Sequence, residues 1–208
     1  MKIILASSSE NRKNLLQKMN FQFSIAPPNF AENWNEKISA AENVQNLARG
    51  KAKSVFSQFE NEKNFLIFGF DSVAILGEKI FGKPRTKKAA FEMIQNLRGE
   101  NHEIFSGISA IGKINGKFFE KTDFEKTKIK FKNNFTNCQI RKYLEFDDWR
   151  GKCGAYSILG AGIFFVEKID GDFQNIVGVP IFKFSAIISA ATQKFPLKIL
   201  QPKNLAKK

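Results

Sequence analysis

Apolar residues along the chain change between strand-like and helix-like spacing, and this pattern predicts an α/β protein. Residues 3–6 form an apolar run with the length and branching of a buried strand. Leu15, Leu16 and Met19 then recur at helical spacing. Residues 65–76 are the most apolar segment of the chain, interrupted by one carboxylate, and predict a central strand.

The other predicted elements follow from the same spacings and from capping and turn residues. Thr86 and Thr136 are each predicted to cap a helix, and Asn115-Gly116 predicts a hairpin turn. The further helices are predicted over residues 40–59, 86–98, 136–144 and 180–195. The further strands are predicted over residues 21–26, 102–112, 118–135 and 163–169.

Consecutive serines separate the first predicted strand from the helix that follows it. Ser7 and Glu10 have the spacing of a capping box that would start this helix. Ser7, Ser9 and Arg12 would then lie at the positive end of a helix, which favours a phosphate group. The alternative is that the serines only cap a surface helix.

Two charged residues stand where the pattern predicts burial. Lys51 falls near the centre of the apolar stripe of the helix at 40–59, so it either extends to the rim or meets an anion. Asp71 interrupts the central strand, where an unpaired carboxylate costs several kcal/mol. It therefore needs a metal, a cation or a strong donor, or it is a structural residue that accepts backbone N–H bonds. Glu32, in the loop after Pro27-Pro28, is a second carboxylate and could simply be solvated.

The composition restricts the classes of function that suit the chain. A formal charge of +13 suits nucleic-acid binding, but lysines scattered along the chain carry most of it, which favours a solvated surface that attracts nucleotides. His102 is the only histidine, which leaves little material for multi-histidine metal sites. Cys138 and Cys153 lack metal-type spacing and suit a reducing compartment. We expect a cytoplasmic protein without a membrane segment or a specific nucleic-acid partner.

Segments in a fixed order resemble the Maf family of nucleoside triphosphate pyrophosphatases, and the resemblance spans nearly the whole chain. A single match of this kind would mean little, whereas several in the right order are hard to explain otherwise. The segments are Leu5-Ala-Ser-Ser-Ser-x-x-Arg12, Leu47-Ala-Arg-Gly-Lys51-Ala, Gly69-Phe-Asp71-Ser-Val, Gly82-Lys83-Pro84, His102-Glu-Ile-Phe-Ser-Gly107, Lys152-Cys-Gly-Ala-Tyr156, Gly171-Asp-Phe and Asn175-Ile-Val-Gly-Val-Pro180.

The resemblance implies a fold and an activity. The implied fold is an elongated α/β structure, a mixed sheet flanked by helices with a cleft between two lobes, here over residues 1–202 with a basic tail at 203–208. Members are often dimeric, so a homodimer is among the states that the resemblance implies. The implied reaction is hydrolysis of a nucleoside triphosphate to the monophosphate and pyrophosphate with Mg²⁺ or Mn²⁺.

The resemblance also assigns roles to residues of this chain. Asp71 stands at the position of the family's proton acceptor, and Glu32 and Asp71 are the implied metal ligands. Asp71 cannot be assigned as both ligand and base from sequence. The implied substrate-binding residues are Ser7, Ser9, Asn11, Arg12, Lys51, Ser72, Lys83 and Leu159.

The departures from the family pattern fall on the positions that select the base. The branch similar to dTTP/UTP pyrophosphatases has Arg, Thr and Gln where this chain has Asn11, Ser72 and Leu159. The 7-methyl-GTP branch typically has Trp, Gln and Glu there, which fits no better. Leu159 is the most disruptive change, because an apolar side chain cannot hydrogen-bond to a base edge.

Two classes of function follow. The first is a metal-dependent nucleoside triphosphate pyrophosphatase, for which the clearance of non-canonical nucleotides is one role to test. The second is a non-catalytic member that binds nucleotides or nucleic acid and regulates cell division. Retention of Glu32, Lys51, Asp71 and Lys83 favours the enzyme.

Overall fold

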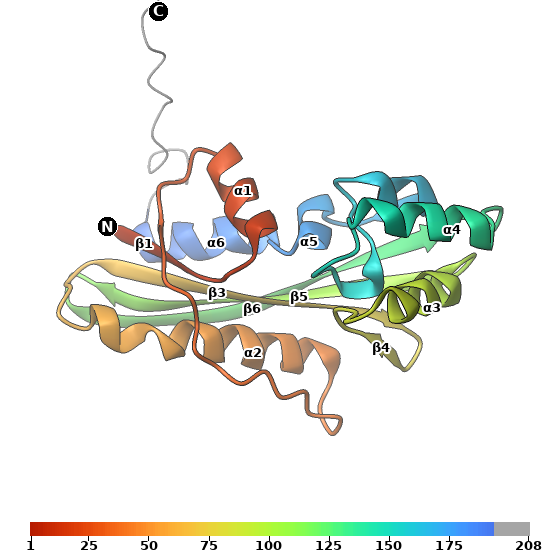
Figure 1. Ribbon diagram of the computed structural model, residues 1–208. Coiled ribbons are helices and arrows are strands. Elements are labelled where there is room, and N and C mark those ends of the chain that lie inside the picture. The colour runs from red at the N-terminus through yellow and green to blue at the C-terminus, as the bar shows by residue number, and fades with distance from the viewer. Residues whose placement is uncertain (194–208) are drawn as a thin grey trace, which may run out of the picture. The chain divides into compact units, whose positions relative to one another are not determined.

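The computed structural model describes residues 1–193, which form a mixed sheet of seven strands flanked by helices (Figure 1). The predicted mixed sheet with flanking helices is confirmed. The strands are β1 (Lys2–Ala6), β2 (Ser24–Ile25), β3 (Phe65–Leu76), β4 (Lys79–Phe81), β5 (Asn101–Ile114), β6 (Lys117–Phe131) and β7 (Val166–Asp170). The α-helices are α1 (Glu10–Lys18), α2 (Ala40–Ser54), α3 (Lys87–Leu97), α4 (Asn137–Tyr143), α5 (Phe173–Val177) and α6 (Ile181–Thr192). The 3₁₀ helices are η1 (Phe56–Phe59), η2 (Leu144–Phe146), η3 (Cys153–Ala155) and η4 (Ala161–Phe165).

The strands follow the order β2-β1-β3-β5-β6-β7, and β4 also pairs with β3. The pairs β1–β2 and β1–β3 are parallel, whereas β3–β4 and β6–β7 are antiparallel. Asn115 and Gly116, with φ of 51° and 79°, make the two-residue turn between β5 and β6, as the sequence predicts. No helix within residues 1–193 is both long enough and apolar enough to cross a membrane.

The described chain divides into two compact units. Unit 1 comprises Met1–Asp71, Gly107–Phe124 and the described residues from Gly178 onward. Unit 2 comprises Ser72–Ser106 and Glu125–Val177.

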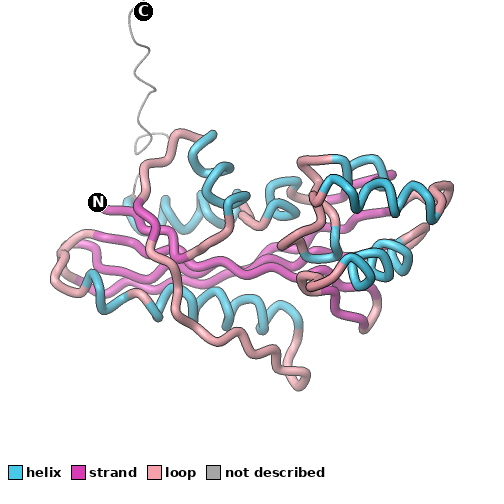
Figure 2. Tube along the Cα trace, viewed as in Figure 1, coloured by secondary structure: helices cyan, strands magenta, loops and turns pink. Residues whose placement is uncertain are grey.

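In unit 1 the sheet is buried on both faces, with α2 on one face and α1 and α6 on the other (Figure 2). Alternate residues of β3 supply the two cores: Phe68 packs with Leu16 of α1 and Phe184 of α6, whereas Ile67 packs with Ala52 of α2. A strand buried on both faces is apolar throughout, which explains why the residues that form β3 are the most apolar of the chain.

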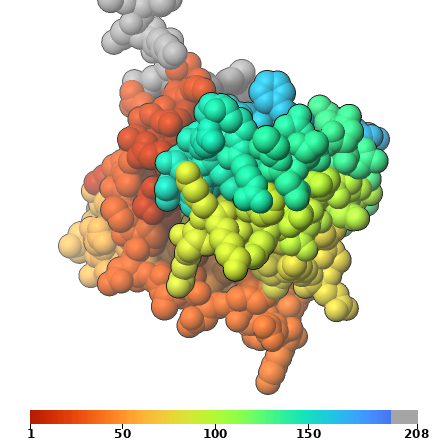
Figure 3. All heavy atoms as spheres, turned by 45° about the vertical axis from the view of Figure 1, so that its right-hand side comes forward, coloured from red at the N-terminus to blue at the C-terminus, as the bar shows by residue number. Residues whose placement is uncertain are grey.

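Unit 2 has a largely aromatic core. Phe131 of β6 is fully buried, and its ring centroid lies 4.9 Å from both His102 and Tyr156. Helix α3 packs against α4 and η3. In Figure 3 the yellow-green and blue-green residues of this unit lie side by side on one face. Thr136 accepts a hydrogen bond from the Gln139 N–H, so the predicted cap of α4 is confirmed. The predicted cap of α3 by Thr86 is confirmed in the same way.

Several predicted boundaries are wrong. In these places a side chain or a helix end bonds backbone groups that the predicted element would have used, or the backbone leaves the helical conformation. The strand predicted at 21–26 is only Ser24–Ile25, since the Phe21 N–H bonds to the Leu16 carbonyl and closes α1. The helix predicted at 40–59 breaks at Val55, whose φ of −110° and ψ of 0° end α2 before η1.

Two further boundaries differ in the last third of the chain. The strand predicted at 163–169 begins only at Val166, because Asp148 accepts a bond from the Ala161 N–H and starts η4 instead. The last helix ends at Thr192, where Gln193 adopts a left-handed φ of 54°. Phe195 and the predicted tail at 203–208 lie outside the described residues.

Candidate active site

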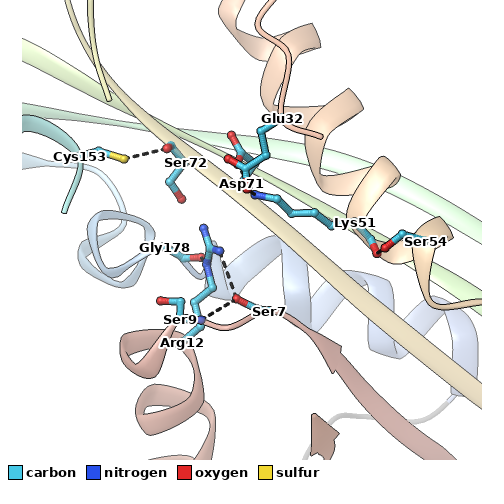
Figure 4. Close-up of polar contacts among 10 residues, drawn as sticks. All are labelled: Ser7, Ser9, Arg12, Glu32, Lys51, Ser54, Asp71, Ser72, Cys153 and Gly178. Atoms are coloured by element: carbon cyan, nitrogen blue, oxygen red, sulfur yellow. Dashed lines mark hydrogen bonds and ion pairs between the residues drawn. The ribbon is translucent and has the colours of Figure 1, made fainter. Parts of the chain in front are cut away.

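The serine turn between β1 and α1 is held by its own side chains (Figure 4). The Ser7 hydroxyl oxygen accepts hydrogen bonds from the Ser9 N–H at 3.2 Å and from Nη1 of Arg12 at 3.3 Å. The predicted capping box is wrong, because Ser9 is the N-cap and makes no side-chain cap bond. Glu10 instead pairs with Lys13 at 3.3 Å.

The charged side chain of Arg12 is held in one position by its contacts. Its side chain lies on the first turn of α1 and is almost entirely buried. Nε donates to the Gly178 carbonyl at 2.9 Å, and the guanidinium carbon lies 5.7 Å from the centroid of the Phe70 ring. These contacts hold one positive group beside the N-terminal end of α1, where the helix dipole also favours an anion.

A second cluster lies on the other face of β3 in the same unit. Nζ of Lys51 lies 2.5 Å from Oδ1 of Asp71 and 2.8 Å from Oε1 of Glu32. The side chains of Lys51 and Asp71 are only 6% and 10% exposed, whereas that of Glu32 is 50% exposed. Lys51 therefore meets an anion rather than extending to the rim, and the cation that Asp71 requires is Lys51.

Local packing brings this cluster together. Gly69 lies against α2, and a Cβ there would overlap the Ala48 carbonyl. Phe65 and Ile67 pack on the α2 face of β3, so Asp71, an even number of residues further on, points to the same face. Helix α2 runs close along β3, and its lysine at position 51 reaches Asp71.

Both groups of residues lie next to the end of the parallel pairing between β1 and β3. The last pair between β1 and β3 is Ala6 with Gly69, so Ser7 and Asp71 both extend just beyond the paired region. Ligands of α/β proteins characteristically bind at this end of parallel strands. Figure 4 shows the serine turn and the lysine–carboxylate cluster around this stretch of β3.

The other predicted site residues are placed as follows. Asn11 lies in α1 and is half-buried. In unit 2, Ser72 is half-buried, Lys83 is exposed in the loop after β4, and Leu159 is 56% exposed between η3 and η4. The structure thus brings together Ser7, Ser9 and Arg12 at one turn and Glu32, Lys51 and Asp71 in one cluster.

Three residues that support these side chains were missed as functional residues. The Gly178 carbonyl holds Arg12, the Ser106 hydroxyl lies 2.8 Å from that of Ser72, and Asn175 accepts a bond from Ser106 at 3.0 Å. Ser106 carried a signal, since it is a polar residue at an inward position of an alternating strand. The sequence gives no such signal for a backbone carbonyl such as that of Gly178.

The donor set fits a divalent cation that also binds substrate. Glu32 and Asp71 converge on a single cation, the Lys51 ammonium. Within residues 1–193 no cluster of three or more His, Cys, Asp or Glu side chains could hold a metal. Mg²⁺ commonly takes one or two carboxylates and fills its remaining positions with phosphate oxygens and water, so two protein ligands suffice.

His102 takes no part in this chemistry. It is fully buried in unit 2, where its Nε2 lies 2.8 Å from the Tyr156 hydroxyl. Burial lowers the pKa of His102 to about 4, so the ring is neutral near pH 7. His102 is therefore not a candidate general base for this site.

These features define an α/β protein with a fixed arginine at a helix N-terminus and a buried lysine–carboxylate cluster, both next to the end of the parallel pairing between β1 and β3. The chain belongs to the Maf family, because the family model described as Maf-like protein matches residues 2–191. The resemblance seen in the sequence motifs is confirmed.

The relatives cover nearly all of the chain. The dTTP/UTP pyrophosphatase of Clostridium botulinum (strain Kyoto / Type A2) is 41% identical over 189 residues, which are 89% of this chain and 95% of the relative. The dTTP/UTP pyrophosphatase of Thermoanaerobacter sp. (strain X514) is 34% identical over 200 residues, 96% of this chain and 100% of the relative.

A solved structure, that of the Staphylococcus aureus Ham1 protein, matches with a TM-score of 0.42 and 16% identity over 64% of this chain and 73% of that protein. This similarity is too low to define the fold.

The homodimer, the cytoplasmic location and the exclusion of nucleic acid stay predictions.

Proposed function

We propose that this chain hydrolyses a nucleoside triphosphate to the nucleoside monophosphate and pyrophosphate. The observation that carries the proposal is the Lys51 ammonium held between Glu32 and Asp71, in the unit that also holds the serine turn. Phosphoryl transfer is catalysed mainly by positioning and charge neutralisation, which these groups supply. Relatives that cover nearly the whole chain and are named for this reaction support the same conclusion.

The serine turn binds the triphosphate. Both lone pairs of the Ser7 oxygen are used by N–H donors of Ser9 and Arg12, so toward a ligand this hydroxyl can only donate. A donor beside a fixed guanidinium and a helix N-terminus suits a phosphate oxygen. Lys83, exposed in the loop after β4 of unit 2, is another cation that the family resemblance assigns to substrate binding.

Asp71 is the general base, and Lys51, which pairs with both Asp71 and Glu32, lies beside it. Asp71 takes a proton from the water that attacks the α-phosphorus, and Lys51 balances the charge of the Asp71 carboxylate before this transfer. Glu32 and Asp71 are the residues that would hold Mg²⁺ or Mn²⁺. Bound there, the metal would offset the charge that develops on the leaving pyrophosphate.

The substrates are uracil and thymine nucleotides, as the names of the relatives suggest. Of the positions that depart from the family pattern, Leu159 can offer the base only apolar contact, and Asn11 replaces the arginine of the dTTP/UTP branch. Ser72 keeps the hydroxyl of the usual threonine. Base selection therefore depends mainly on Ser72.

The test is a panel assay of UTP, dTTP, CTP, GTP, 7-methyl-GTP and ITP with Mg²⁺ or Mn²⁺, with pyrophosphate measured. We expect kcat/KM for UTP and dTTP to exceed that for the purine nucleotides by about tenfold or more. Chelation of the metal should abolish the release of pyrophosphate. Failure to release pyrophosphate from any of the six nucleotides with either metal would instead favour the non-catalytic regulator.

A further inference from the structure

We infer that Phe30 and Gly50 are positioning residues that hold Glu32 at the pair formed by Lys51 and Asp71. The inference rests on the proposed function, in which Glu32 and Asp71 are the metal ligands. It adds the contact that fixes the more exposed of these two ligands. All five residues belong to unit 1, and Figure 4 shows Glu32 and Lys51 meeting at Asp71.

The loop that carries Glu32 has little regular structure of its own. Residues 26–35 are in neither a helix nor, beyond β2, a strand, and the Glu32 side chain is 50% exposed. Loops are generally more mobile than helices and strands, and holding an exposed carboxylate in one geometry costs side-chain entropy. The 2.8 Å contact of Glu32 with Lys51 therefore depends on how the loop is anchored.

Both ends of the loop are tied to regular structure. At its start, the Ala26 N–H donates to the Leu5 carbonyl of β1 at 3.1 Å. At its end, the buried side chain of Asn43 in α2 accepts from the Asn35 N–H at 2.9 Å and donates to the Asn35 carbonyl at 2.8 Å. These bonds fix where the loop begins and ends, and Glu32 lies between them.

Phe30 anchors the middle of the loop on α2. The outer edge of its ring lies against Gly50, where a Cβ would overlap the Cζ, Cε1 and Cε2 atoms of the ring. The ring thus occupies the space that any other residue at position 50 would need. Gly50 directly precedes Lys51, and Phe30 stands two residues before Glu32. The contact therefore joins the segment that carries the lysine to the segment that carries the carboxylate.

The presence of a glycine in this helix supports the same role. Gly50 is the only glycine of α2 and lies in its interior, where glycine destabilises a helix relative to alanine. It does not adopt the left-handed conformation that would call for glycine. The close approach of the Phe30 ring is thus what requires a residue without a side chain at this position.

The experiment measures the Kd of Mn²⁺ by electron paramagnetic resonance in the presence of a non-hydrolysable UTP analogue. Gly50→Ala should displace the Phe30 ring, and Phe30→Ala removes it. Residues that support a metal ligand typically contribute 10–100-fold to metal affinity, so each variant should raise the Kd of Mn²⁺ about tenfold. The value of kcat for UTP at saturating Mn²⁺ should change far less, since Asp71 keeps its contact with Lys51.

Stability separates this role from a purely structural one. Alanine favours a helix interior over glycine, so Gly50→Ala should leave the urea midpoint of unfolding unchanged or raised while the Kd of Mn²⁺ rises. Phe30→Leu keeps an apolar side chain against Gly50 and should restore most of the affinity for Mn²⁺.

Two double variants test whether the effect passes through this contact and through Glu32. If Gly50→Ala acts by displacing the ring, it should raise the Kd of Mn²⁺ no further in the Phe30→Ala background. Phe30→Ala should likewise have no further effect in the Glu32→Gln background. Phe118→Ala is the matched control: this ring of the same unit is 62% exposed and packs on Phe56, with 6.0 Å between the centroids. Its removal should leave the Kd of Mn²⁺ unchanged.

An unchanged Kd of Mn²⁺ in folded Gly50→Ala and Phe30→Ala, with the unmodified protein active, would overturn the inference and leave the proposed function in place. A further rise from Phe30→Ala in the Glu32→Gln background would also overturn it. If Phe30→Ala does not fold, Gly50→Ala decides alone. Failure of the unmodified protein to hydrolyse any nucleotide would overturn the proposed function instead, and the Kd of Mn²⁺ would then decide the inference by itself.

Discussion

Replacement of Asp71 by asparagine is expected to abolish turnover and to leave the fold intact. An amide has nearly the shape of the carboxylate and keeps an oxygen that can accept from Lys51, but it cannot take a proton from water. General-base catalysis is typically worth 10²–10⁴-fold, so kcat for pyrophosphate release should fall by about 10³-fold. The measurement is steady-state kinetics with UTP, together with circular dichroism and the Kd of a non-hydrolysable analogue, which should change only a few-fold.

Asp123→Asn is the control for this change. Asp123 belongs to the same unit and pairs with Lys183 at 3.3 Å on a partly exposed surface. Its variant should retain kcat within about twofold, since exposed ion pairs contribute little. Normal turnover by Asp71→Asn would remove Asp71 from the mechanism.

Replacement of Lys51 by methionine is expected to have the largest effect on stability. Methionine fills the space of the lysine stem, but it leaves the buried carboxylate of Asp71 without its cation. Removing one partner of a buried pair typically costs 3–5 kcal/mol, and because the half-exposed Glu32 can be solvated, we expect a loss of about 3 kcal/mol in the free energy of unfolding. Urea denaturation measures this value, and pyrophosphate release should be lost as well.

Lys53→Met is the matched control on the same helix. Lys53 is 53% exposed, and its Nζ lies 3.7 Å from Glu120, so its removal should change the free energy of unfolding by less than about 0.5 kcal/mol. Equal losses for the two variants would contradict a buried ion pair at Lys51. A loss at Lys51 that disappears in the Asp71→Asn background would tie the effect to this pair.

Much of the fold could be predicted from the sequence, and the errors have local causes. Strand β3 was predicted with both of its ends, because a strand buried on both faces is apolar over its whole length. The capping box at Ser7 was predicted wrongly because the Ser-x-x-Glu spacing does not reveal that Arg12 uses the Ser7 oxygen. Helix α5 has five residues, too few to show a helical period, and it was missed.

The candidate site was predictable in part. Lys51 and Asp71 attracted attention because charges within apolar patterns need partners, and the structure pairs them with each other. That Glu32 joins the same cluster depends on the path of a loop that periodicity does not describe. The bond from Ser106 to the Asn175 carbonyl joins residues 69 positions apart, and only the fold reveals it.

Hydrolysis of UTP in water enriched in ¹⁸O tests most directly the claim that water attacks the α-phosphorus. Mass spectrometry of the products after a single turnover locates the oxygen that entered. The account predicts the label in UMP, with unlabelled pyrophosphate as the other product. Label in pyrophosphate, or release of orthophosphate and UDP, would place the attack at another phosphorus and contradict it.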